Sequence, residues 1–88
     1  MIELVQAINN ILMREELVGA SQGSLQWYLK NNLNDYKAVL EANSSARDIQ
    51  NASKAFLHFC TESMDWDNPL YKECCKLAEA GMKLSKNL

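Results

Sequence analysis

Apolar residues recur along the chain every three to four positions, in four blocks, which is the period of amphipathic α-helices. The first block predicts a helix over residues 2–18 that ends at Gly19, because glycine commonly adopts the left-handed conformation that follows a helix. The inward face of this helix is expected to carry Leu4, Ile8, Ile11 and Val18.

The second block begins after a short loop and predicts a helix over residues 24–42, capped by Ser24 or, as the alternative, Ser21. Its inward positions are Leu25, Leu29, Leu33, Tyr36 and Leu40. Asparagines at 31, 32 and 34 weaken its middle, because their side chains compete for backbone hydrogen bonds. This helix is therefore expected either to continue to Asn43 and Ser44 or to break near Asn31–Asn34.

The third block predicts a helix over residues 46–64, and Ser45 with Asp48 resembles a capping box at its start. The inner stripe is expected to be Ile49, Ala52, Phe56, Phe59 and Ser63, widened by Ser53, Leu57, Cys60 and Met64. An apolar arc this wide indicates a partner surface or a central helix.

The fourth block follows the clearest boundary in the chain, the segment 65–69, which reads Asp-Trp-Asp-Asn-Pro. Proline is favoured in the first turn of a helix, so Asp67 or Asn68 is expected to be the cap. The inward residues are expected to be Leu70, Cys74, Leu77, Ala78 and Met82. Gly81 either ends this helix or permits a close contact with another one.

Four amphipathic helices with short loops predict one all-α domain over residues 1–88. The expected architecture is a four-helix up-and-down bundle, or three long helices and one broken one. The composition agrees, since leucine and alanine are abundant, there is one threonine, and apolar residues make up 48% of the chain.

The expected location is the cytoplasm. No run of about 18 apolar residues is present, so no membrane-spanning segment is predicted. The acidic Glu3 and the polar Gln6 near the start are unlike a secretory signal.

The chain offers little for catalysis or metal binding. Its one histidine, His58, lies on a polar face and points about 200° away from Cys60. The three cysteines, Cys60, Cys74 and Cys75, lack the spacing of a zinc site. We therefore expect no enzyme activity, no metal and no cofactor, and free thiols of which the more exposed of Cys74 and Cys75 is redox-sensitive.

Three aromatic residues are the best candidates for contact with a partner, because tryptophan and tyrosine are enriched at interface hot spots. Trp27 and Tyr28 are adjacent and cannot both face the core. The alternative for Trp27 is burial among its leucine neighbours. Trp66 lies between two aspartates and either folds back over the end of the bundle or faces a partner.

Lysines form a stripe on the fourth helix, made of Lys72, Lys76 and Lys83 together with Lys86. Residues 69–88 carry a net charge of +2, whereas the rest of the chain carries −4. The stripe is interpreted as a solvated face, with docking of an acidic protein as an alternative. Nucleic-acid binding is less favoured, because Glu79 interrupts the stripe and phosphate contacts would be few.

The sequence as a whole favours a small, non-enzymatic protein that binds another protein, such as an inhibitor, an immunity-type protein, an adaptor or a chaperone. The expected contact residues are Trp66, Trp27 and Tyr28, with Lys72, Lys76 and Lys83 adding orientation and association rate. A homodimer through the same face is an alternative. The rival functions are a nucleic-acid-associated regulator and a thiol- or metal-dependent protein.

Overall fold

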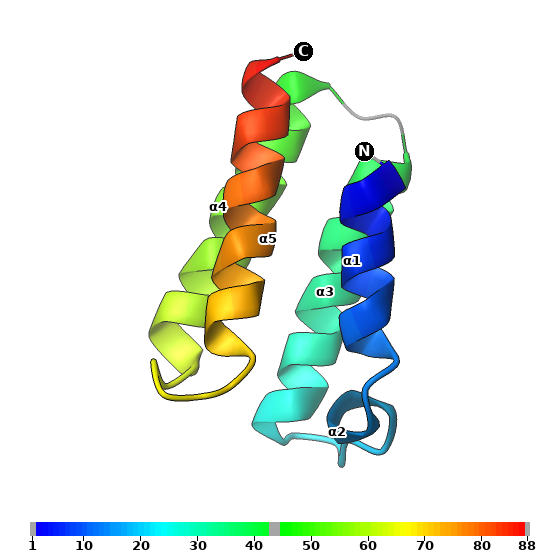
Figure 1. Cartoon of the computed structure of the whole chain (residues 1–88), viewed down its shortest axis with the longest axis vertical. Helices are drawn as coiled ribbons and strands as arrows, with labels where there is room; N and C mark the ends of the chain where they lie inside the picture. Colours follow the sequence, from blue (N-terminus) through cyan, green and yellow to red (C-terminus); the bar gives the residue numbers. More distant parts are fainter. Residues whose placement is uncertain (1, 43–44, 88) are drawn as a thin grey trace.

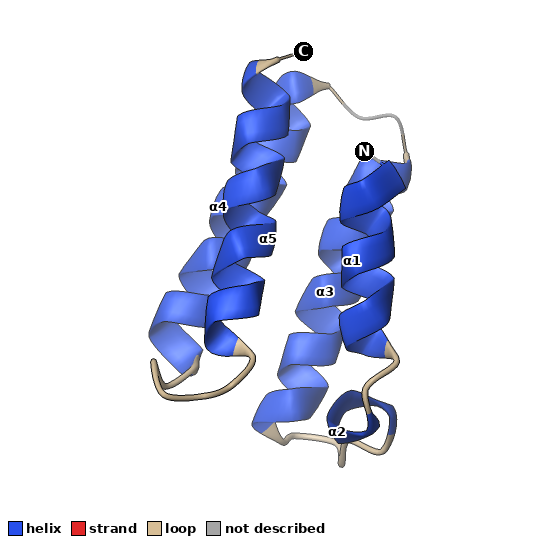
Figure 2. Ribbon diagram, viewed as in Figure 1, coloured by secondary structure: helices blue, strands red, loops and turns tan. Residues whose placement is uncertain are grey.

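The computed structural model describes residues 2–42 and 45–87, and within these ranges it contains helices and loops but no strand (Figure 2). The helices are α1 (Ile2–Leu12), α2 (Glu15–Val18), α3 (Leu25–Glu41), α4 (Ala46–Ser63) and α5 (Tyr71–Lys86). The predicted all-α class is confirmed. None of the helices in the described part of the chain combines the length and the apolar character needed to cross a membrane.

The four long helices run alternately up and down (Figure 1) and form a closed ring of contacts. Helix α4 packs against α3 and α5, and α1 packs against α3 and α5 on the other side. The short α2 contacts α1 and α3 at one end of the molecule. This arrangement is compatible with the expected up-and-down bundle, with α2 as an addition.

The single helix predicted over residues 2–18 is wrong, because the chain leaves the helical conformation at Met13 and Arg14. Arg14 has an extended backbone (φ −67°, ψ 145°). In a continuous helix Leu17 would lie about 180° from the buried Ile8, on the solvent side. The break rotates Leu17 inward to 0% exposure and leaves Val18, the residue expected inside, 63% exposed.

Helix α3 is continuous across the asparagine-rich segment, so the alternative break near Asn31–Asn34 is wrong. The Asn32 side chain donates a hydrogen bond to the Tyr28 carbonyl one turn earlier (2.8 Å), and the helix accommodates it. The predicted cap is confirmed, since Ser24 Oγ accepts the Trp27 amide (3.2 Å). The whole leucine–tyrosine stripe from Leu29 to Leu40 is buried, as expected. The predicted continuation to Asn43 and Ser44 lies outside the described residues.

Helix α4 begins as predicted, because Ser45 Oγ accepts the Asp48 amide at 3.2 Å. Its buried stripe, however, consists of Ile49, Ser53, Phe56 and Cys60. Of the residues expected on the inner stripe, Ala52 and Phe59 are half-buried and Ser63 is exposed. The stripe is shifted because α4 packs against both α3 and α5, so the side chains between those two contacts are the most enclosed.

Replacing the α4 cap tests this local account. Ser45→Ala is expected to lower the free energy of unfolding by about 1 kcal/mol, because the Asp48 amide loses its acceptor. Ser45→Gly is the matched control and is expected to cost only a few tenths of a kcal/mol. Urea denaturation measures both, and equal losses in the two variants would contradict a capping role.

A buried polar cluster joins α3, α4 and α5. The Tyr36 hydroxyl donates to the Leu77 carbonyl (2.8 Å), and burial raises the pKa of Tyr36, so the hydroxyl remains protonated. Ser53 Oγ lies 3.1 Å from the Tyr36 hydroxyl and 2.7 Å from the Ile49 carbonyl oxygen, and donates its proton to one of them. Gly81 is buried within α5 directly beside this cluster, which confirms the close-contact alternative for that glycine.

Candidate interaction surface

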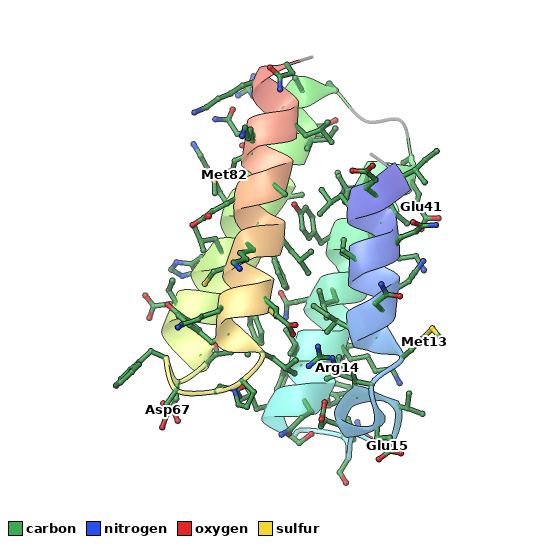
Figure 3. All side chains as sticks on the ribbon, in the orientation of Figure 1. Met13, Arg14, Glu15, Glu41, Asp67 and Met82 are labelled. Atoms are coloured by element: carbon green, nitrogen blue, oxygen red, sulfur yellow. The ribbon has the colours of Figure 1, made fainter. Side chains whose placement is uncertain are left out.

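One end of the bundle gathers three segments that are far apart in the sequence. Helix α2, the start of α3 and the loop between α4 and α5 all lie at the end opposite the two termini (Figure 1). Figure 3 shows Arg14, Glu15 and Asp67 at this end. The aromatic candidates Trp66, Trp27 and Tyr28 belong to the segments that form it.

A hydrogen-bonded turn presents Trp66 to solvent. The Asn68 amide donates to the Asp65 carbonyl (2.9 Å), which places Trp66 and Asp67 at the two central positions of a β-turn. Met64 and Leu70 are each 6% exposed and anchor the two ends of the loop in the core. Trp66 is 80% exposed, so the alternative in which it folds back over the bundle is wrong.

The α4–α5 loop is ordered by its own polar groups as well as by its apolar ends. Asn68 Oδ1 accepts the Leu70 amide at 2.9 Å, and the Asn68 carbonyl accepts the Tyr71 amide at 2.9 Å. Asn68 therefore supplies acceptors just before α5, but the N-cap of the helix is Leu70 and carries no side-chain cap bond, so the predicted cap at Asp67 or Asn68 is wrong. A turn with these bonds loses little conformational entropy when a partner docks.

A pocket of about 190 Å³ lies at the same end, between the start of α3 and the α4–α5 loop. Its apolar lining consists of Leu25, Leu29, Met64, Pro69 and Leu70. Its polar lining consists of Arg14, Glu16, Gln26 and Asn68. A cavity of this kind, mainly apolar with a few polar groups, can accept one apolar side chain of a partner.

The ion pair between Arg14 and Glu73 connects the α1–α2 junction to the first turn of α5. The guanidinium lies 2.9 Å from the carboxylate, with about two fifths of each side chain exposed (40% and 45%). An exposed pair contributes little to stability. Its effect is positional, because it fixes Arg14 at the edge of the pocket.

Trp27 and Tyr28 lie on a different side of α3 from the pocket. Their rings meet edge to face with centroids 4.9 Å apart. Tyr28 is 49% exposed and Trp27 is half-buried. Leu25 and Leu29 face the pocket, and Trp27, two positions from each, projects to the opposite side of the helix. The alternative of burial among its leucine neighbours is met only in part, because Trp27 is half-buried.

The lysine stripe occupies the outer face of α5, away from the pocket. Lys72, Lys76 and Lys83 are all exposed and lie opposite the buried residues of the helix, with Glu79 among them. No lysine lines the pocket beside the α4–α5 loop. Lys76 instead lines an open groove of about 370 Å³ along the seam between α1 and α5. The predicted contact residues thus fall on three separate surfaces.

The three thiols gather at the interface of α4 and α5. Cys60 and Cys74 are each 0% exposed, and Cys75 is half-buried. The pKa of Cys60 is raised by its interaction with Cys74 and by burial. Among residues 2–42 and 45–87, no three His, Cys, Asp or Glu side chains are grouped so as to hold a metal ion.

Sequence reasoning missed the pocket, because its lining comes from three segments that are far apart in the chain and its leucines were assigned only to the core. The one available signal was the turn sequence at 65–69, which lies between two apolar residues. It indicated a helix boundary, but it did not indicate which segment of the chain packs beside that boundary. Comparison of the chain with protein-family models, curated proteins and solved structures finds no match.

Proposed function

We propose that this chain is a small non-enzymatic protein of the cytoplasm that binds another protein through Trp66 and the pocket at the same end of the bundle. The observation that carries the proposal is the 80% exposure of Trp66 on a hydrogen-bonded turn at the end of the bundle that also holds an apolar pocket. Tryptophan buries a large apolar area on binding and is the residue type most enriched at interface hot spots.

The geometry also indicates the chemistry of the partner. A partner that covers Trp66 must offer it an apolar surface, and the pocket at the same end of the bundle accepts one apolar side chain. Asp65 and Asp67 flank Trp66 and are exposed, so hydrogen-bond donors or basic groups suit the partner's rim. The lysine stripe then contributes to orientation and association rate from a separate face, if the partner is large enough to reach it.

Trp66→Ala is expected to weaken capture of the partner at least tenfold and to leave the melting temperature nearly unchanged. The first effect follows from the loss of a hot-spot side chain, and the second from its exposure in the free protein. The measurement is quantitative affinity purification of the tagged protein from its native cells, with protein and nucleic acid both determined. Thermal unfolding of each purified variant accompanies it.

Val18→Ala is the matched control, because Val18 is an apolar side chain on α2 at the same end, 63% exposed, that does not line the pocket. It is expected to retain the partner at the level of the original chain. Equal capture by all three proteins would contradict the proposal, as would an eluate that contains nucleic acid without protein. Sedimentation of the purified chain distinguishes a homodimer, which Trp66→Ala would then dissociate.

A further inference from the structure

The only two fully buried thiols in the described part of the chain lie on α4 and α5, the helix pair with the most extensive mutual packing. Cys60 is on α4 and Cys74 is on α5, and both are 0% exposed. Each position lies on the inward stripe of its helix. Because the two helices are antiparallel neighbours, their side chains approach from opposite sides of the interface.

We propose that Cys60 and Cys74 form a reversible disulfide when the protein meets a hydroperoxide, so that α4 and α5 become covalently linked. A disulfide needs Cα atoms roughly 4.4–6.8 Å apart, a separation that facing residues of closely packed helices can reach. Cys60 lies three residues before the end of α4 and Cys74 three residues after the start of α5, so the two buried positions are at the same level of the helix hairpin.

The chemistry balances with hydrogen peroxide as the oxidant. The Cys74 thiolate attacks one peroxide oxygen, the O–O bond breaks, and Cys74 becomes a sulfenic acid while hydroxide leaves. The Cys60 sulfur then attacks the sulfur of Cys74, the S–O bond breaks, and hydroxide leaves again. Two thiols and one peroxide thus give one disulfide and two waters. The balance is the same if Cys60 is the first nucleophile.

The cross-link would close the segment from Cys60 to Cys74, which contains the whole α4–α5 loop with Trp66. A closed loop restricts the unfolded chain, and for a loop of this length the melting temperature is expected to rise by roughly 12–24 °C. Any effect on partner binding rests on the proposed function. The mass and melting-temperature readouts below do not depend on a partner.

The experiment treats the folded, reduced protein with hydrogen peroxide, alkylates the remaining thiols after denaturation, and measures intact mass and melting temperature. The expected product is a monomer lighter by two hydrogens before alkylation, with one thiol left to alkylate and a raised melting temperature that a reducing agent reverses. Cys75→Ser is the matched control and is expected to give the same cross-link, because Cys75 is half-buried and outside the pair.

Cys74→Ser is expected to lose the cross-link, and Cys60→Ala gives the same test if the serine variant does not fold. After digestion with trypsin, peptide mapping is expected to find the fragment that contains Cys60 linked by a disulfide to the fragment with residues 73–76. The same link in the Cys75→Ser protein identifies Cys74 as the partner of Cys60. The proposal is overturned if the cross-link persists in Cys74→Ser, if it is intermolecular, or if only Cys75 is oxidised.

Discussion

Gly81→Ala is expected to lower the free energy of unfolding by about 3 kcal/mol. An added Cβ at this position would overlap the Tyr36 and Ser53 hydroxyls and would lie 3.0 Å from Tyr36 Cζ. Overpacking a core typically costs about 1–3 kcal/mol. Displacing either hydroxyl adds the cost of a broken buried hydrogen bond, on the order of 1–3 kcal/mol.

The sign of this effect separates packing from helix propensity. In an exposed helix interior, glycine to alanine stabilises by about 1 kcal/mol, because alanine is the better helix former. Gly81 is buried within α5, so the same change is expected to destabilise. Chemical denaturation of the variant makes the measurement, and a neutral or stabilising result would contradict the close approach of α5 to Tyr36 and Ser53.

A rescue experiment completes the Gly81 test. The double variant Tyr36→Phe with Ser53→Ala removes both hydroxyls that the new Cβ would meet. In that background Gly81→Ala is expected to cost about 1 kcal/mol or less, since only the ring of residue 36 remains close. An undiminished loss would place the steric conflict elsewhere in the interface.

Phe56→Ala is expected to lower the free energy of unfolding by about 4 kcal/mol, which is within the range for the loss of a fully buried phenylalanine side chain. Phe56 is 2% exposed, and its ring stacks on that of Tyr36 with centroids 5.2 Å apart. Because a chain of this size has a stability on the order of 5 kcal/mol, the variant would be barely folded.

Phe59→Ala is the matched control for Phe56→Ala, because Phe59 is on the same helix but only half-buried. The free energy of unfolding is expected to fall clearly less in Phe59→Ala, by about 1–2 kcal/mol. Urea denaturation of both variants gives the comparison. Equal losses would show that the inner stripe of α4 is centred as the sequence suggested, on Phe56 and Phe59 together.

The sequence pattern predicted α3 well, because its leucine period and its Ser24 cap act locally. It failed at Met13 and Arg14, where no proline or glycine marks the break. The break is stabilised by tertiary contacts, since it buries Leu17 and places Arg14 against Glu73. A local pattern cannot report a contact between residues so distant in the chain.

The candidate site was only partly predictable. Trp66 could be identified as a candidate because it lies in a turn sequence between two charged residues. Its exposure depends on the hydrogen bond from Asn68 to Asp65 and on the anchoring of Met64 and Leu70, which only the folded chain shows. The pocket forms only when Leu25 and Leu29 of α3 lie at the same end of the bundle as the α4–α5 loop. That placement follows from the directions in which α3, α4 and α5 run.

Site-specific photo-crosslinking tests the central claim most directly. A benzophenone amino acid is placed at residue 66, and in separate proteins at residue 18 on α2 and at residue 83 on the lysine face. The proposal expects, on irradiation in native cells, a discrete protein adduct from residue 66 and none from residue 18. An adduct from residue 83 with none from residue 66 would contradict it, and would place the interaction surface on the outer face of α5.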